Sequence, residues 1–235
     1  MTISSATRPV DVYRTRLGER SQIEPRPHPV VWGKAPAPGP LTGPELAAYD
    51  ARGYHAQQDV LSDNDIAESS HDARRIADEL GDDDRVIREP SNGDVRSLFA
   101  AHELSTVVAE ICAREDIVGV ARQILDDDVY IHQSRINFKP GFSGGPFYWH
   151  SDFETWHAED GMADIRAVSC SIALTHNYPY NGSLMVIPGS HRTFYPCIGA
   201  TPDNHHGTSL VAQQVGTPEQ TTLTTAVDRH GIDQF

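Results

Sequence analysis

The sequence lacks any apolar run long enough to cross a lipid bilayer. A membrane-spanning helix needs about 20 mostly apolar residues, whereas hydrophobic residues make up only 38% of this chain and its mean hydropathy is −0.44. The opening residues, 1–9, also lack the charged and apolar segments of a secretory signal peptide. We therefore expect a cytoplasmic protein without a membrane partner.

Cysteine and positive charge are scarce as well. Cys112, Cys170 and Cys197 are too few and too widely spaced to suggest a disulfide framework or a thiolate zinc site. The chain has 19 Lys and Arg against 33 Asp and Glu, a formal net charge of −14. Because binding to nucleic acid depends on cations that face the phosphate backbone, we expect no nucleic-acid partner.

The first half of the chain predicts an extended arm followed by helices. A stretch rich in proline within residues 1–41 favours extended backbone over a packed helix. The segment Thr42–Glu45 has the capping-box pattern, and we expect a short helix over 43–52. Apolar residues at a helical period predict a second helix that ends at Gly81 and a long third helix over 105–125.

From residue 129 onward the composition becomes typical of strands. An Asn181–Gly182 turn signal precedes the last of three segments in which we expect strands: 129–138, 166–175 and 183–187. Helices followed by strands predict an α+β fold whose body is a sandwich or jelly roll. We expect a single domain over 1–235, with an arm over 1–41, helices over 42–128 and strands over 129–235.

Residues 147–157 carry the most informative side chains. On a strand, residues i and i+2 share a face, so His150 and Asp152 direct an imidazole and a carboxylate at one point. Two histidines and one carboxylate hold Fe(II) in non-haem oxygenases. The pair supplies two of those three ligands, and a surface pair on a strand is the alternative interpretation.

A polar stripe precedes this segment. Gln133, Arg135 and Asn137 alternate along the predicted strand and therefore project from one face. That face is either the solvated side of the sheet or the wall of a cavity that binds a polar small molecule. In the second case the planar guanidinium of Arg135 suits a carboxylate.

Three ordered segments carry a family resemblance: Gln133–Phe142, Tyr148–Met162 and Asn181–His191. In these segments the chain resembles the ectoine hydroxylases, which belong to the phytanoyl-CoA-dioxygenase-like Fe(II)/2-oxoglutarate oxygenases. The resemblance implies a double-stranded β-helix (jelly-roll) core with N-terminal helices. It also implies hydroxylation of ectoine to 5-hydroxyectoine under osmotic stress, with Fe(II) as the metal and 2-oxoglutarate and O2 as cosubstrates.

The same resemblance implies a role for individual positions. His150 and Asp152 match two iron ligands. The positions that match 2-oxoglutarate contacts are Asn137, Phe147 and Ser171. Those that match the ectoine pocket are Gln133, Arg135, Trp156 and Ala167. Phe147 has the opposite strand parity to His150, so it reaches the cosubstrate only if the strand bulges or begins after it.

The resemblance fails at two places. The family pattern has a Lys-Glu pair where this chain has Gly144–Pro146. The distal iron histidine and the arginine for the far carboxylate of 2-oxoglutarate are expected after Gly231, in strands that would follow Phe235. We therefore interpret the chain as one that ends before them. The histidines that remain open as a replacement ligand are His157, His176, His191, His205, His206 and His230.

Three alternatives to ectoine hydroxylation stay open. The first alternative is a related oxygenase that acts on another small polar acid. The second is a truncated, catalytically impaired module that binds ectoine. A third alternative is a cupin-type metal protein that combines Glu154 with His150. The sequence leaves the oligomeric state undecided, with a homodimer as one option.

Overall fold

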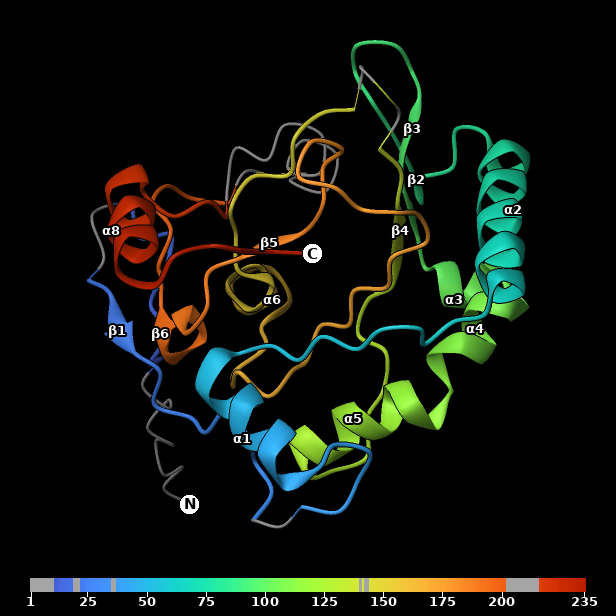
Figure 1. Ribbon diagram of the computed structural model, residues 1–235. Helices are drawn as coiled ribbons and strands as arrows, with labels where there is room; N and C mark the ends of the chain where they lie inside the picture. The colour runs from blue at the N-terminus through green and yellow to red at the C-terminus, as the bar shows by residue number, and fades with distance from the viewer. Residues whose placement is uncertain (1–10, 19–21, 35–36, 140, 142–143, 202–215) are drawn as a thin grey trace, which may run out of the picture.

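The computed structural model combines short antiparallel sheets with the helices that surround them (Figure 1). It describes residues 11–18, 22–34, 37–139, 141, 144–201 and 216–235. The mixture of helices and antiparallel strands confirms the broad α+β class. Within these ranges, no helix combines the length and the apolar character that crossing a membrane requires.

The described strands form three antiparallel sheets. The largest has the order β2-β3-β4 and pairs Leu98 of β3 with Ile136 of β4. The other two sheets join segments far apart in the sequence, β1 with β6 and β5 with β7. The strands are β1 (Glu24–Pro25), β2 (Val86–Arg88), β3 (Val95–Phe99), β4 (Arg135–Asn137), β5 (Met185–Val186), β6 (Thr193–Phe194) and β7 (Asp233–Gln234).

Helices α1 (Gly43–Arg52) and α2 (Asp63–Leu80) have the ends that the sequence predicts. The Thr42 side chain accepts a hydrogen bond from the amide of Glu45, whose carboxylate accepts one from the Thr42 amide, so the capping box is complete. Glycine follows each helix at positive φ, 87° at Gly53 and 58° at Gly81. The predicted helix over 43–52 and the predicted stop at Gly81 are therefore confirmed.

The predicted single helix over 105–125 is wrong, because the structure divides it into α4 (Thr106–Cys112) and α5 (Glu115–Leu125). Between them Arg114 has extended backbone, and its guanidinium bonds to Asp116 and to the carbonyl of Val60. Both helices bury apolar residues, so the apolar period runs across the break. The remaining helices are α3 (Ala101–Leu104), α6 (Asp152–Asp160), the 3-10 helix η1 (Ser190–Arg192) and α8 (Gln220–His230).

The expected strands are shorter than predicted or absent. Only Arg135–Asn137 of 129–138 and Met185–Val186 of 183–187 lie in a sheet, and 166–175 is irregular. Residues suited to strands form one only where a neighbouring strand completes the hydrogen-bonded ladder. Among the described residues, no strand pairs with 166–175 in such a ladder.

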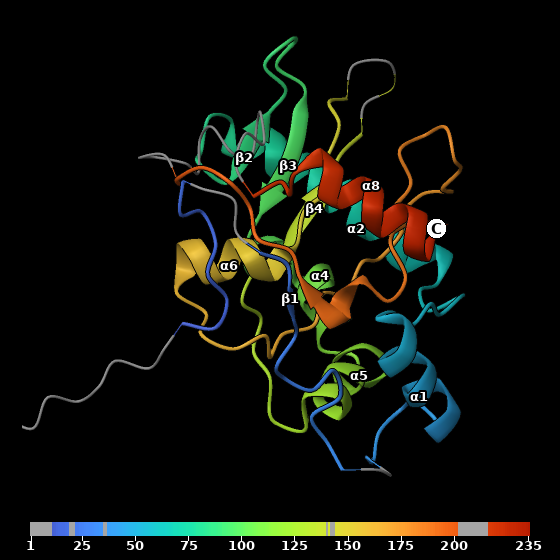
Figure 2. The same ribbon diagram turned by 90° about the vertical axis from the view of Figure 1, so that its left-hand side faces the viewer.

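Three clusters of buried apolar side chains connect these elements. One packs α1 against α5. A second, with Ile76 and Leu98, packs α2 on the outer side of the three-stranded sheet (Figure 1). The third consists of Tyr13, Phe153 and Phe194, and it holds α6 between the N-terminal segment and β6. Figure 2 shows α1 beside α5, with α8 at a distance from both helices.

Candidate metal centre

His150 and Asp152 lie at the start of helix α6. Residues 144–151 form no strand and Asp152 is the first residue of the helix, so the expected strand arrangement is wrong. The Ser151 side chain instead caps the helix by accepting a hydrogen bond from the amide of Glu154. The two candidate ligands still meet, because Nε2 of His150 lies 3.3 Å from Oδ1 of Asp152.

One hydrogen bond orients the imidazole of His150, and another orients the carboxylate of Asp152. Nδ1 of His150 lies 2.7 Å from the carbonyl oxygen of Tyr148. Since a carbonyl oxygen only accepts, Nδ1 carries the proton of this bond. The Ser169 hydroxyl donates to Oδ2 of Asp152 over 2.6 Å. Nε2 and Oδ1 are therefore the atoms that face each other across the site.

Each of the two groups stabilises the charge of the other. Burial disfavours the imidazolium of His150, but the hydrogen bond and the charge of Asp152 outweigh burial and raise the pKa of His150. Burial also disfavours the carboxylate of Asp152, yet His150 and Ser169 lower the pKa of Asp152 to about 2. The site thus presents an ionised carboxylate at neutral pH.

This pair of donors fits Fe(II). An imidazole nitrogen and a carboxylate oxygen are ligands that non-haem iron uses, and the bonds from Nδ1 of His150 and from Ser169 are of the kind that orient ligands from outside the coordination sphere. Within the described part of the chain, no group of three His, Cys, Asp or Glu side chains is placed to hold a metal ion. The described residues therefore offer iron two ligands.

The other candidate histidines have neighbours of their own. His157 and His191 each hydrogen-bond a backbone carbonyl, that of Met162 and that of Asp50, at 2.7 Å and 2.9 Å. Neither forms a triad with the pair at α6. The remaining candidates are His176, which lies beside Tyr178, His230, which lies near Gly189, and His205 and His206, which fall outside the described residues.

Glu154 pairs with the N-terminal segment. Its side chain is fully buried, and its carboxylate accepts hydrogen bonds from the guanidinium of Arg16 and the hydroxyl of Thr15. Because the charge of this carboxylate is already paired, the cupin-type alternative that combines Glu154 with His150 is wrong.

The predicted polar stripe lies partly on strand β4. Arg135 and Asn137 are the first and last residues of β4 and share a face, while Gln133 precedes the strand and is exposed. Oδ1 of Asn137 accepts a hydrogen bond of 2.8 Å from the Ser97 hydroxyl on β3. Two of the three residues therefore keep the predicted alternation within a strand.

Phe147 connects this strand to a buried ion pair that the sequence analysis missed. The guanidinium carbons of Arg96 and Arg135 lie 4.1 Å and 5.8 Å from the centre of the Phe147 ring. Arg96 is 2% exposed and pairs with Glu89 at 2.9 Å. Phe147 lies in irregular backbone, so strand parity does not restrict its direction. A charged residue between Val95 and the pair Leu98 and Phe99 of strand β3 is the signal that could have revealed this arrangement.

Among the described residues, the side chains of Trp156, Ala167 and Ser171 form no hydrogen bond to the side chains of His150 and Asp152. The Trp156 ring lies on α6 and meets the ring of His132 edge-on at 5.2 Å. Ala167 and Ser171 lie two positions before and after Ser169 in the irregular segment. Since Ser169 donates to Asp152, the same segment brings both residues to the neighbourhood of the candidate metal ligands.

Comparison with known families identifies the family to which this chain belongs. Residues 49–231 match the model of the phytanoyl-CoA dioxygenase (PhyH) family. The chain belongs to the phytanoyl-CoA dioxygenase family. The match includes both candidate metal ligands and every residue of the polar stripe.

Relatives within the PhyH family are similar over nearly the whole chain. The ectoine dioxygenase of Nocardia farcinica is 50% identical over 228 residues, which cover 96% of this chain and 74% of the relative. That of Streptomyces avermitilis is 47% identical over 227 residues, with coverage of 96% and 77%. The crystal structure of EctD from S. alaskensis with 2-oxoglutarate and 5-hydroxyectoine is 39% identical, with a TM-score of 0.84 and coverage of 96% and 74%. The structure of the same protein with bound Fe is 40% identical, with a TM-score of 0.81 and coverage of 96% and 75%.

Proposed function

We propose that this protein hydroxylates ectoine to 5-hydroxyectoine in a reaction that uses Fe(II), 2-oxoglutarate and O2. The observation that carries the proposal is the pair of His150 and Asp152 at the start of α6, in a chain that is 50% identical to an ectoine dioxygenase. Solved structures of a similar protein contain 2-oxoglutarate and 5-hydroxyectoine, and Fe. The enzyme is thus a 2-oxoglutarate-dependent dioxygenase.

The proposed fold is a double-stranded β-helix, or jelly roll, with helices before it. One oxygenase domain over 1–235 has an arm over 1–41, mainly helices over 42–128 and the jelly-roll strands over 129–235. Membership of the PhyH family and the TM-score of 0.84 support this assignment. The arm contributes β1, which pairs with β6, a strand far from it in the sequence.

Each residue around the site has a proposed role. Fe(II) is held by Nε2 of His150 and the carboxylate of Asp152. The 2-oxoglutarate site is formed by Asn137, Phe147 and Ser171, and the ectoine site by Gln133, Arg135, Trp156 and Ala167. The guanidinium of Arg135 on β4 supports this division, because its planar fork suits the carboxylate of ectoine.

The protein acts mainly by positioning. Bound Fe(II), with 2-oxoglutarate and O2, supplies the oxidation that turns a C–H bond of ectoine into C–OH and yields succinate and CO2. The carbonyl of Tyr148 and the hydroxyl of Ser169 keep the ligand atoms of His150 and Asp152 turned toward each other. Trp156 provides an aromatic wall for the substrate ring, so that the reacting carbon is held in place.

Turnover of ectoine tests this function. With Fe(II), 2-oxoglutarate, O2 and ectoine, we expect 5-hydroxyectoine and succinate in equal amounts by mass spectrometry. His150→Ala should form neither product, whereas the control His71→Ala, which changes an exposed histidine of α2, should match the wild-type protein. Turnover of another small polar acid but not ectoine would contradict the substrate. Ectoine binding without any turnover would contradict the enzymatic role.

A further inference from the structure

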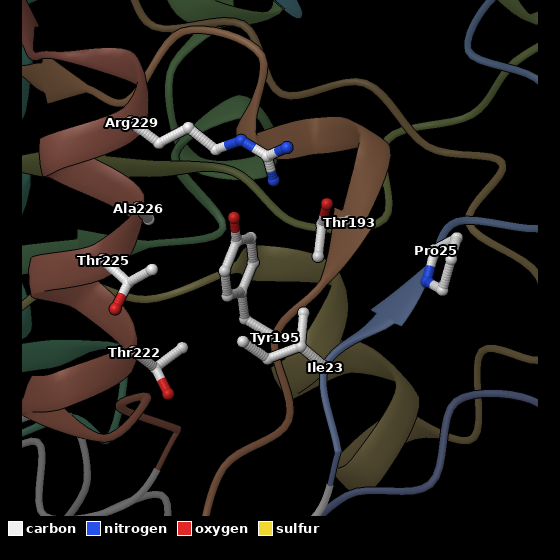
Figure 3. Close-up of a pocket in the computed structure, with 8 residues that line it drawn as sticks. All are labelled: Ile23, Pro25, Thr193, Tyr195, Thr222, Thr225, Ala226 and Arg229. Atoms are coloured by element: carbon white, nitrogen blue, oxygen red, sulfur yellow. The ribbon is translucent and has the colours of Figure 1, made fainter.

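A pocket of about 250 Å³ lies between β1, β6 and helix α8 (Figure 3). Its apolar walls include Ile23 and Pro25 from the N-terminal segment and Ala226 from α8. None of the residues assigned above to Fe(II), 2-oxoglutarate or ectoine lines this pocket. The pocket is therefore separate from the candidate metal centre.

Three polar groups gather at one end of the pocket. In Figure 3 the guanidinium of Arg229 lies at this end, and the hydroxyl groups of Tyr195 and Thr193 point toward it. Across the part of the chain that the structure describes, the side chains of these three residues form no hydrogen bond or ion pair. Thr225, by contrast, uses its hydroxyl on the carbonyl of Thr221 over 2.9 Å. The end near Arg229 thus holds donors that are available to a ligand.

The charge of this pocket is opposite to that of the protein. The chain has 33 acidic and 19 basic side chains, yet the residues that line the pocket include one cation, Arg229, and no acid. An arginine fork donates two parallel hydrogen bonds to a carboxylate. The hydroxyl groups of Tyr195 and Thr193 can donate to the same oxygen atoms.

We propose that the pocket binds a small monocarboxylate with an apolar body. The carboxylate pairs with Arg229 and accepts hydrogen bonds from Tyr195, and the apolar body lies against Ile23 and Ala226. A single charged end beside apolar walls favours such a molecule over an inorganic anion, which leaves the walls uncovered, and over a neutral molecule, which leaves the guanidinium unpaired.

Three probes separate the contributions of charge and apolar contact. Benzoate, benzamide and inorganic phosphate are titrated into the ¹⁵N-labelled protein, and the amide signals of Tyr195 and Ala226 are followed by NMR. We expect benzoate to bind in the millimolar range and to shift both signals. Benzamide has the same shape without the charge, and phosphate has charge without the apolar ring, so each should bind at least about tenfold more weakly.

Matched arginine variants locate the site. Arg229→Gln should weaken benzoate binding at least about tenfold, because the charge-assisted contact is lost. Arg74→Gln, which changes an exposed arginine of α2, should leave the affinity within about twofold. Equal benzoate affinity in the wild-type protein and Arg229→Gln would overturn the proposal, as would equal binding of benzamide or phosphate, or shifts confined to other residues. Because Arg229 is exposed, an unchanged melting temperature of Arg229→Gln verifies that the comparison is made between folded proteins.

Discussion

The guanidinium of Arg16 forms two hydrogen bonds with the carboxylate of Glu154 in the interior of the protein. Nε donates to Oε1 over 3.0 Å and Nη2 donates to Oε2 over 2.9 Å, and the two side chains are 4% and 0% exposed. Burial disfavours the charge of the guanidinium, but hydrogen bonds to Glu154 and Glu159 outweigh burial and raise the pKa of Arg16. The pair fastens the N-terminal segment to the first turn of α6, the helix that begins at Asp152.

Removal of this guanidinium should destabilise the fold strongly. We predict that Arg16→Ala lowers the free energy of unfolding by about 3 to 5 kcal/mol, because the Glu154 carboxylate stays buried without its partner. The control is Arg75→Ala, which breaks exposed pairs with Asp72 and Glu79 and should cost less than about 1 kcal/mol. Chemical denaturation measures both. A cost for Arg16→Ala no larger than that for Arg75→Ala would contradict this interpretation.

Loss of either candidate ligand should weaken iron binding. We predict that His150→Ala and Asp152→Ala each abolish formation of 5-hydroxyectoine and reduce Fe(II) affinity on the order of a hundredfold, since a ligand is worth a few kcal/mol and about 1.4 kcal/mol is tenfold. Anaerobic titration with Fe(II) measures the affinity. Ser169→Ala keeps both ligands but removes the hydrogen bond to Oδ2 of Asp152, and it should cost about tenfold. Wild-type affinity in Asp152→Ala would remove this residue from the metal site.

Local signals explain which elements could be predicted from the sequence. The capping box at Thr42–Glu45 and the glycines after α1 and α2 act within one or two turns, so the sequence alone locates these helix ends. The same kind of signal precedes α6, where Ser151–Glu154 has the capping-box spacing. The spacing of His150 and Asp152 favours a strand instead, but the capping-box spacing of Ser151 and Glu154 predicts the local structure correctly.

Contacts between distant residues explain what the sequence could not predict. Arg16 and Glu154 are 138 positions apart, and no periodicity connects them. The contact of Phe147 with Arg96 depends on how the irregular segment before α6 passes β3, and local propensity carries no information about that path. The irregular course of 166–175 likewise depends on which strands lie beside it.

The aromatic wall proposed for ectoine gives a kinetic prediction. We expect Trp156→Ala to raise the KM for ectoine more than the KM for 2-oxoglutarate, because in the proposed site the indole contacts the substrate ring and not the cosubstrate. Steady-state kinetics with each substrate varied in turn measures the two values. An unchanged ectoine KM would remove Trp156 from the substrate site.

Two glycines at helix ends provide a matched pair for stability. A Cβ atom at Gly53, after α1, would collide with the ring of His191, whereas a Cβ atom at Gly161, after α6, would have no described atom within 4 Å apart from its chain neighbours. Both residues have left-handed backbone, with φ of 87° and 73°, so each alanine substitution carries a similar backbone strain of about 1 to 2 kcal/mol. We predict that Gly53→Ala destabilises the protein by at least about 1 kcal/mol more than Gly161→Ala, owing to overpacking. Equal melting temperatures for the two variants would show that His191 moves aside freely.

Tyr13 combines burial with a polar contact. It is 0% exposed, and its hydroxyl oxygen lies 2.5 Å from Nδ1 of His28, whose Nε2 lies 3.4 Å from Asp164. The ring of His157 packs against the phenol at a centroid distance of 5.8 Å. Burial raises the pKa of Tyr13 to about 12, an effect that the charge of Arg26 partly opposes and that of Asp164 reinforces.

This raised pKa predicts a loss of stability at high pH. An unfolded tyrosine titrates near pH 10, so below about pH 10 the native and unfolded chains both keep the proton. Between about pH 10 and the native pKa of about 12, only the native chain keeps it, and the free energy of unfolding falls by about 2 to 3 kcal/mol. Tyr13→Phe has no such proton, and its comparison with the wild-type protein cancels the titration of other tyrosines and cysteines. Denaturation of both proteins between about pH 9 and pH 12 measures the difference. Parallel stability curves would show that the Tyr13 hydroxyl titrates as it does in the unfolded chain.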